Sequence, residues 1–196
     1  RTLDRTTDGE GPVSNFTLSE LKELDAGSWF KEEFRGERIP TLEETLEQIR
    51  GKIAVNIEIK PESYQILETF DAIEAQICKL IEKFEMEDSI IISSFEYSFF
   101  SKIKSFYKKH NKSNSIRIAP LQDSFQTKEL ILSLCRKEKA YSYHPNESFV
   151  TENLINLLTV SGYRIFPYTI NDYKRMKQLV EFGVSGIITD EPEKLW

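Results

Sequence analysis

Apolar positions along most of the chain alternate between two periodicities, one typical of strands and one typical of helices. Short β-branched or aromatic runs, which indicate buried strands, lie at residues 53–59, 89–95, 116–121, 140–143, 164–170 and 186–189. Between them, apolar residues recur at three- and four-residue steps at 71–84, 99–107, 127–137, 151–160 and 172–182. Strand–helix repeats of about two dozen residues suit parallel βα units, so the pattern predicts about six parallel strands.

The first part of the chain has a different pattern. Residues 1–51 are polar and glycine-bearing, with short helices predicted at 18–24 and 42–49. We interpret this segment as a loop and helix insertion that connects strands, and 1–196 as one domain whose βα units occupy 52–196. Helix starts at Thr151 and Asp172, and glycines at 162 and 183 just past helix ends, support the later boundaries.

Two architectures fit six strands with helical crossovers. One is an open doubly wound sheet, and the other is a closed eight-stranded barrel that lacks its beginning. No glycine-rich phosphate loop follows the first predicted strand, which weakens the dinucleotide-binding version of the open sheet.

The run at 56–61 carries two opposite charges, Glu58 and Lys60, two positions apart on a predicted strand. Alternation along a strand puts Asn56, Glu58 and Lys60 on one face, and Ile57 and Ile59 on the other. Glutamate is a ligand type for hard metals and lysine is a phosphate-binding type. A solvated edge strand with a local ion pair also explains the run, so the choice depends on the rest of the chain.

Polar and aromatic residues also collect where the other predicted strands end. They are Ser93, Ser94, Phe95, Gln122, Asp123, His144, Tyr168, Thr169, Asn171, Thr189 and Asp190. In a barrel, catalysis occurs at this end of the strands. The residue types suggest an anionic substrate held by a metal, with an aromatic wall against an apolar or glycerol-like body. Strand ends are also polar simply because loops are exposed.

The remaining reactive residues suggest structural roles. His110 lies in a basic helix end and is interpreted as a surface C-cap. His144 is better placed, but a structural role is favoured over a role as general acid or base. Cys78 and Cys135 have no metal or redox spacing and are interpreted as buried free thiols.

Composition limits the classes of partner. A net charge of -6 argues against a nucleic-acid binder that works by bulk electrostatics. No apolar run approaches transmembrane length, and no signal peptide is visible. Because the chain begins at Arg1 without methionine, we interpret it as a fragment or a processed chain. Its location is unknown, with the cytoplasm slightly favoured and export left open.

Short motifs along the chain resemble those of the glycerophosphodiester phosphodiesterase family. They are TLDRTTDG at 2–9, TLSEL at 17–21, LDAG at 24–27, IPTLEE at 39–44, NIEIK at 56–60, YTIN at 168–171 and GVSGIITDEP at 183–192. They cover essentially the whole chain in the same order, which makes the resemblance specific.

The resemblance implies a fold, a reaction and site residues. The family fold is a (β/α)8 barrel, here incomplete with about six of the eight βα units. Its members hydrolyse small glycerophosphodiesters to glycerol 3-phosphate and an alcohol with a divalent cation, Ca²⁺ or Mg²⁺. Glu58 resembles the metal-binding glutamate, Lys60 the catalytic, phosphate-facing lysine, and Phe95 and Tyr168 the aromatic substrate-binding walls. Tyr168 stands where many members have tryptophan, which adds a hydroxyl to that wall.

The chain begins after three motifs of the family: His-Arg-Gly, Glu-x-Asp and His-Asp. Two hypotheses follow. The first is a metal-dependent phosphodiesterase whose N-terminal catalytic segment is missing. The second is a catalytically dead, truncated barrel that binds a phosphate-bearing ligand or a partner chain. Another phosphate-binding barrel, similar to phosphoinositide phospholipases, is disfavoured by the match of the short motifs.

We expect this chain, expressed alone, to release no glycerol 3-phosphate from glycerophosphocholine and to be poorly stable. The family comparison leaves it without both catalytic histidines, and missing strands would leave open sheet edges. Joining it to an upstream segment that carries the three motifs should restore folding and turnover. Metal-dependent release by the bare chain would contradict this expectation.

Overall fold

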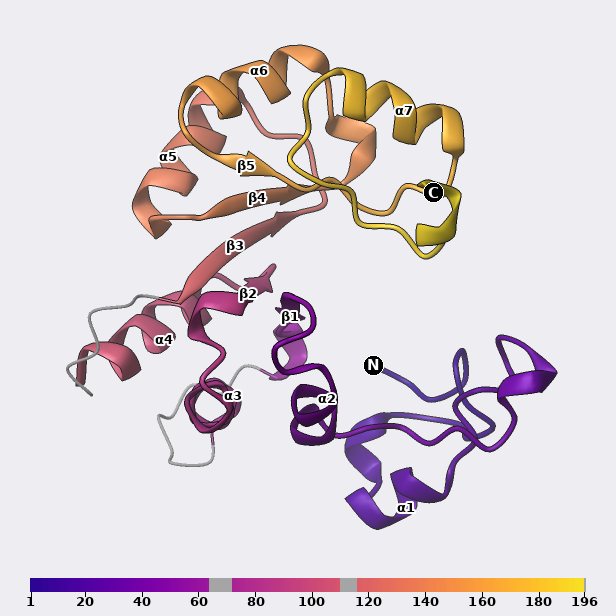
Figure 1. Ribbon diagram of the computed structural model, residues 1–196. Helices are drawn as coiled ribbons and strands as arrows, with labels where there is room; N and C mark the ends of the chain where they lie inside the picture. The colour runs from indigo at the N-terminus through magenta and orange to yellow at the C-terminus, as the bar shows by residue number, and fades with distance from the viewer. Residues whose placement is uncertain (64–71, 110–115, 196) are drawn as a thin grey trace. The chain divides into compact units, whose positions relative to one another are not determined.

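The computed structural model describes residues 1–63, 72–109 and 116–195 (Figure 1). The chain forms two compact units, residues 1–53 and residues 54–196. Asp71, at the expected start of one helix, and His110, the expected C-cap, lie outside the described residues. The interpretation of 1–196 as one domain stays a prediction.

The first unit contains the two helices predicted for it. These are α1 (Leu18–Glu23) and α2 (Leu42–Ile49), and 3-10 turns cover Val13–Asn15 and Glu32–Phe34. Each helix begins with a capping box, in which a threonine side chain and a glutamate three residues later bond to each other's backbone N–H. The caps are Thr17 with Glu20 and Thr41 with Glu44. These local signals explain why both boundaries were predictable.

The second unit is built on a parallel sheet. In the described residues the sheet has five strands: β1 (Val55–Glu58), β2 (Ile90–Ser94), β3 (Arg117–Gln122), β4 (Ser142–Pro145) and β5 (Arg164–Ile165). They pair in the order β1-β2-β3-β4-β5, and every pair is parallel. The predicted parallel sheet is confirmed.

The unreversed strand order decides between the two architectures. A doubly wound sheet reverses its order and so carries helices on both faces. Here each strand pairs with the next along the chain, and right-handed crossovers then put the helices on one face. The sheet is therefore wound as in a (β/α)8 barrel, with part of the ring present.

The sixth predicted strand, at 186–189, is not a strand in the described residues. The backbone N–H of Ile188 donates to Pro167 O at 2.9 Å, and that of Ile170 donates to Ile188 O at 3.0 Å. These two hydrogen bonds, one on each side of Tyr168, attach this segment to the β5 side of the sheet. They do not make a continuous ladder, so the strand predicted at 186–189 is wrong, and five of the about six predicted strands are present.

One α-helix follows each of the five strands. They are α3 (Ile73–Phe84), α4 (Ser98–Lys109), α5 (Lys128–Glu138), α6 (Glu152–Val160) and α7 (Tyr173–Glu181). Thr151 and Asp172 cap α6 and α7 as predicted, and Gly162 and Gly183 take positive φ angles of 83° and 86° after them. None of the helices in the described part of the chain has the length and apolar composition of a membrane-spanning segment.

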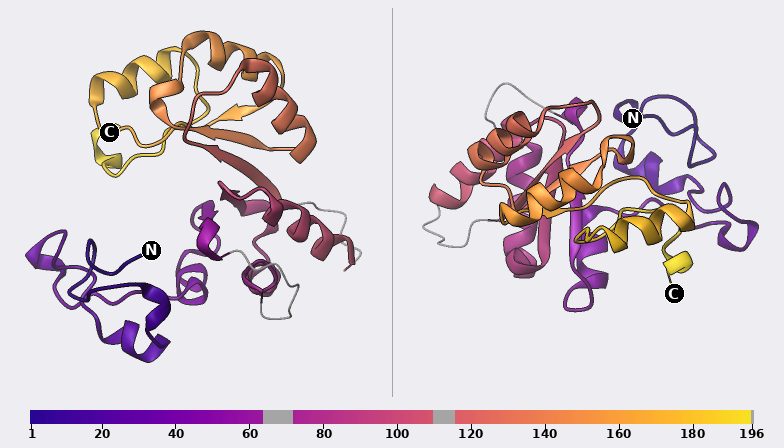
Figure 2. Two further views of the ribbon diagram at one scale, coloured as in Figure 1. Left: turned by 180° about the vertical axis from the view of Figure 1, so that it is seen from behind. Right: turned by 90° about the horizontal axis from the view of Figure 1, so that it is seen from above.

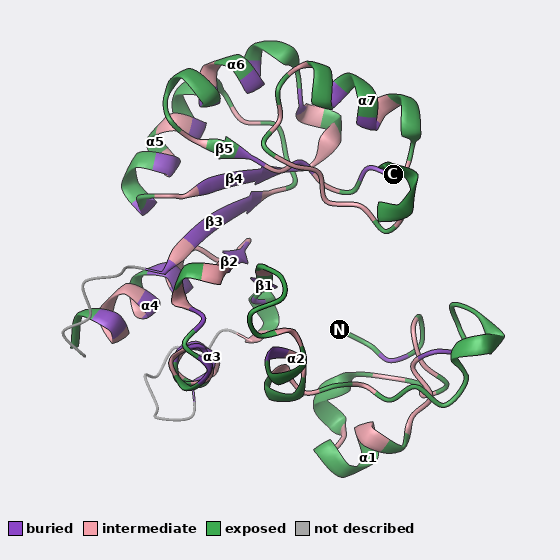
Figure 3. Cartoon of the chain, in the orientation of Figure 1, coloured by how far each residue is buried: buried purple, intermediate pink, exposed green. Residues whose placement is uncertain are grey.

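An apolar core lies between α5, α6, α7 and the strands β4 and β5 (Figures 1, 2 and 3). Its members include Ile131, Cys135, Tyr143, Leu154, Ile155, Leu158, Ile165, Met176 and Leu179. Tyr143 from β4 and Ile165 from β5 mark the helix-facing side of the sheet. Both cysteines are buried free thiols, which confirms their interpretation.

Phe166 is fixed between neighbouring segments on the opposite side of the sheet. Its ring lies edge-on to the imidazole of His144, with 5.3 Å between ring centroids. The ring also lies close to Gly186, where an added Cβ would be 2.6 Å from it. Ser185 N donates to Ile165 O at 3.1 Å and keeps this segment close. Only glycine fits at 186 without moving the ring.

We predict that Gly186→Ala lowers the free energy of unfolding by about 1–3 kcal/mol, the usual cost of overpacking. Urea denaturation measures the change. In a Phe166→Ala background the penalty should be smaller, because the Cδ1 and Cε1 atoms that crowd residue 186 are gone. Equal penalties in the two backgrounds would contradict the crowding account.

Candidate active site at the carboxyl ends of the strands

The strand register brings a set of side chains to one face of the sheet. Paired residues of parallel strands point to the same side, and residues alternate along each strand. Glu58 pairs with Ser93, and Ser93 with Ala119. The same face continues through Leu121, His144 and Tyr168, because Leu121 pairs with His144 and Asn146 with Tyr168. This face is opposite to the helix-facing side that carries Tyr143.

Glu58 and Lys60 form an ion pair at the end of β1. The Lys60 Nζ atom lies 2.7 Å from Glu58 Oε1, and the side chains are 62% and 31% exposed. Ile59, between them, is buried on the other side. The two residues therefore share a face as the alternation predicted. β1 is also an edge strand of the described sheet, so the geometry is equally that of a local ion pair.

Ser94 holds the ends of β1 and β2 together. Its hydroxyl donates to Ile59 O at 2.7 Å and accepts from Glu96 N at 3.0 Å. Ile59 N donates in turn to Ser93 O at 2.9 Å. Ser94 is fully buried, so these bonds are shielded from water. The backbone that carries Lys60 is thus fixed against the backbone that carries Phe95.

Phe95 and Tyr168 make an aromatic pair above the sheet end. Their ring centroids are 6.1 Å apart and the ring planes are nearly perpendicular, at 89°. The Tyr168 hydroxyl donates to Gln122 O at 3.0 Å, so a side chain from the β5 side reaches the end of β3 across β4. Burial, and then the negative charges of Asp123 and Glu58, raise the pKa of Tyr168, so its hydroxyl stays protonated.

His144 is buried on the site-facing side of the sheet and is 1% exposed. Its Nε2 atom lies 2.9 Å from Ser142 Oγ. Burial lowers the pKa of His144 to about 4, because a charged imidazole loses its hydration there. A neutral, enclosed imidazole packed against Phe166 suits a structural role better than a role as general acid or base.

Asn171 ties the last segment of the chain to the site. Its Oδ1 atom accepts from Thr189 Oγ1 and from Asp190 N, both at 3.0 Å, and its Nδ2 atom donates to Asp190 Oδ2 at 3.0 Å. Asn171 stands three residues after Tyr168 and so helps to fix the segment that carries the tyrosine. The sequence placed Asn171 and Gln122 at strand ends but did not reveal these partners, because both contacts join distant parts of the chain.

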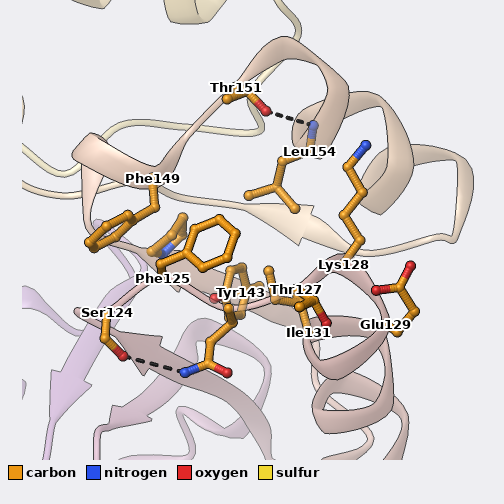
Figure 4. A pocket seen from close by; sticks show the side chains of 12 residues that line it. Ser124, Phe125, Thr127, Lys128, Glu129, Ile131, Tyr143, Phe149, Thr151 and Leu154 are labelled. Carbon is orange, nitrogen blue, oxygen red and sulfur yellow. Dashed lines mark hydrogen bonds between the residues drawn. The ribbon is translucent and has the colours of Figure 1, made fainter.

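A pocket of about 280 Å³ opens near these strand ends but on the helix-facing side of the sheet (Figure 4). Ile131, Tyr143 and Leu154 line it, and Phe125 and Phe149 stand at its side. None of the four predicted site residues lines this pocket. The expectation that Glu58, Lys60, Phe95 and Tyr168 face one shared cleft therefore stays a prediction.

The described residues at the strand ends offer few oxygen ligands for a metal ion. The described residues contain no group of three or more His, Cys, Asp or Glu side chains that could hold a metal ion. Glu58 is the carboxylate that ends β1 on the site-facing side, and Asp123 follows β3.

Comparison with known proteins identifies relatives along nearly the whole chain. A sequence model of the glycerophosphoryl diester phosphodiesterase family matches residues 1–194. A glycerophosphodiester phosphodiesterase from Caldanaerobacter subterraneus subsp. tengcongensis is 38% identical over 195 residues, which are 99% of this chain and 75% of that protein. One from Bacillus altitudinis is 34% identical over 197 residues, covering 98% of this chain and 75% of that protein.

Solved structures agree in fold. An Oleispira antarctica phosphodiesterase in complex with its product sn-glycerol-3-phosphate superimposes with a TM-score of 0.80 at 28% identity, covering 99% of this chain and 74% of that one. A glycerophosphodiester phosphodiesterase from Agrobacterium tumefaciens superimposes with a TM-score of 0.74 at 24% identity, covering 98% and 76%. The second match supports the fold alone.

We predict that His144 makes stability fall in mild acid. The unfolded imidazole titrates near 6.5 and the folded one near 4, so the unfolded state binds the extra proton between these values. The contribution is full above pH 6.5 and is lost as pH falls to 4, by about 3 kcal/mol in total. Unfolding free energies from pH 8 to pH 4 should therefore fall more steeply for wild type than for His144→Gln. Parallel profiles would contradict a buried neutral His144.

Proposed function

The chain belongs to the glycerophosphoryl diester phosphodiesterase family, and from this we propose that its strand-end site binds the phosphoryl group of a glycerophosphodiester through Lys60 and through a cation held by Glu58. The enzyme hydrolyses glycerophosphodiesters to glycerol 3-phosphate and an alcohol. The observation that supports the site is the common face shared by Glu58, Lys60 and Tyr168 at the carboxyl ends of the strands. In barrel enzymes that end carries the catalytic groups.

Lys60 is proposed to neutralise the phosphoryl group. A lysine ammonium is a compact charge on a flexible stem with three donors, which suits a phosphoryl oxygen. Its present partner is Glu58, and both side chains reach solvent. An exposed ion pair of this kind contributes little stability, so Lys60 can exchange the carboxylate for a phosphoryl oxygen at small cost.

The family depends on a metal ion, and we propose Glu58 as one ligand of a hard divalent cation, Ca²⁺ or Mg²⁺. The fit rests on the donor type, since these ions bind carboxylate oxygens, waters and substrate phosphates. Glu58 is solvent-accessible, so water molecules can share the coordination. When bound, such a cation polarises a phosphoryl oxygen as a Lewis acid.

Phe95 and Tyr168 are proposed as walls for the alcohol part of the substrate. Both rings are partly exposed at the end of the sheet. The hydrogen bond from the Tyr168 hydroxyl to Gln122 O fixes one ring, and the perpendicular contact orients the other against it. Fixed aromatic surfaces bury part of a ligand without losing side-chain freedom when it binds.

We predict that Glu58→Gln removes most activity of the complete enzyme and that excess cation restores part of it. The amide keeps the shape of the side chain but loses the charge that attracts the metal, so the metal midpoint should rise about tenfold or more. Activity measured across a metal titration tests this. Glu152→Gln, which removes an exposed carboxylate on α6, should leave the curve unchanged.

Lys60→Ala should behave differently in the same titration. It removes a charge that faces the phosphoryl group, so kcat should fall about 100- to 1000-fold and added cation should not restore it. Identical metal curves for wild type and Glu58→Gln would contradict the ligand role. Near-normal turnover of Lys60→Ala would contradict the phosphoryl contact.

A further inference from the structure

Phe95 and Tyr168 form an aromatic corner at the end of the sheet. Perpendicular ring planes with centroids 6.1 Å apart give two ring surfaces that meet at a right angle. The rings come from residues 73 positions apart, just after β2 and just after β5, and both keep exposed surface. Adjoining aromatic surfaces attract a cation through the negative faces of their rings, and quaternary ammonium groups are recognised in this way.

The Tyr168 hydroxyl is already engaged and cannot donate to a ligand. Its single proton is donated to Gln122 O at 3.0 Å. The corner therefore offers a ligand ring surface and no hydroxyl donor. The ring faces themselves offer a neutral polyol such as glycerol no hydrogen bond in place of those it makes to water, which costs free energy. A quaternary ammonium group has no such hydrogen bonds to lose.

The local charge also favours a cation. Asp123 follows directly after Gln122, whose carbonyl accepts from Tyr168, so its exposed carboxylate lies at the same strand end. In the described part of the chain, the structure gives this carboxylate no ion-pair partner, whereas Glu58 is paired with Lys60. The negative charges of Asp123 and Glu58 also raise the pKa of Tyr168, which agrees with their closeness to the ring. The side chains of Asp123, Glu58 and Lys60 together carry one net negative charge.

We propose that this corner selects the substrate: Phe95, Tyr168 and Asp123 recognise a quaternary ammonium alcohol, so the preferred diesters are those of choline type. Phe95 and Tyr168 supply the ring faces, and Asp123 supplies the charge. The inference rests on the proposed function, because it assumes that the phosphoryl group lies near Lys60.

The test compares two diesters of nearly identical shape. One is glycerophosphocholine, and the other is the glycerophosphoryl ester of 3,3-dimethylbutanol, in which carbon replaces the charged nitrogen. Binding to the complete enzyme is measured by calorimetry in chelator, so that metal-dependent turnover does not interfere. The choline diester should bind about 3- to 30-fold more tightly, the ratio expected for a cation–π contact.

Variants locate the source of the preference. Tyr168→Leu should bring the two affinities within about twofold, while Tyr168→Phe, which keeps the ring, should retain most of the preference. Asp123→Asn should reduce the preference more at low salt than at high salt, because an exposed charge is screened. Glu152→Gln, the matched loss of a distant carboxylate, should change nothing. Retention of the wild-type ratio in Tyr168→Leu would overturn the inference.

The outcomes separate this inference from the proposed function. Equal binding of both diesters, with normal release of glycerol 3-phosphate when metal is restored, overturns the cationic corner and leaves the phosphoryl site intact. Failure of either diester to bind, together with loss of glycerol 3-phosphate release, overturns both. A choline preference that depends on Tyr168 and Asp123 supports the inference.

Discussion

The parallel pairing of the strands in unreversed order is the constraint on which the site depends. Because every strand runs in the same direction, the residues that follow each strand meet at one edge. Because the register is fixed pair by pair, Glu58 and Tyr168 face the same side although 110 positions separate them in the chain. A slip of one residue in any pair would turn one strand's set of side chains to the helix-facing side.

One face of the sheet contributes to the apolar core, and the other carries the candidate site residues. Tyr143, Ile165 and the apolar sides of α5, α6 and α7 form a core, and burial of that apolar surface is the main stabilising term. The opposite face carries Glu58 and Tyr168 near solvent and His144 enclosed as a neutral group. Ser94 and Tyr168 add hydrogen bonds between strand ends, each of about 1 kcal/mol, which fix the geometry more than they raise stability.

Local signals explain what the sequence predicted well. Helix starts at Thr151 and Asp172 were visible because the cap side chain bonds within its own turn. Strand alternation placed Glu58 and Lys60 on one face. The strand predicted at 186–189 was wrong because these residues attach through one hydrogen bond on each side of Tyr168, which no local pattern reveals. The bond from Tyr168 to Gln122 spans 46 positions, and the packing of Phe166 against Gly186 depends on tertiary contact. Long-range contacts of this kind have no signature in a single sequence.

A crystal structure of the complete enzyme with Ca²⁺ and glycerol 3-phosphate tests the central claim most directly, because it locates the phosphoryl group without relying on turnover. The account predicts a phosphate oxygen within hydrogen-bonding distance of Lys60 Nζ, a Glu58 carboxylate oxygen about 2.3–2.6 Å from the cation, and Tyr168 still bonded to Gln122 O. Product bound on the helix-facing side of the sheet, with the Glu58–Lys60 pair unchanged and the cation elsewhere, would contradict it.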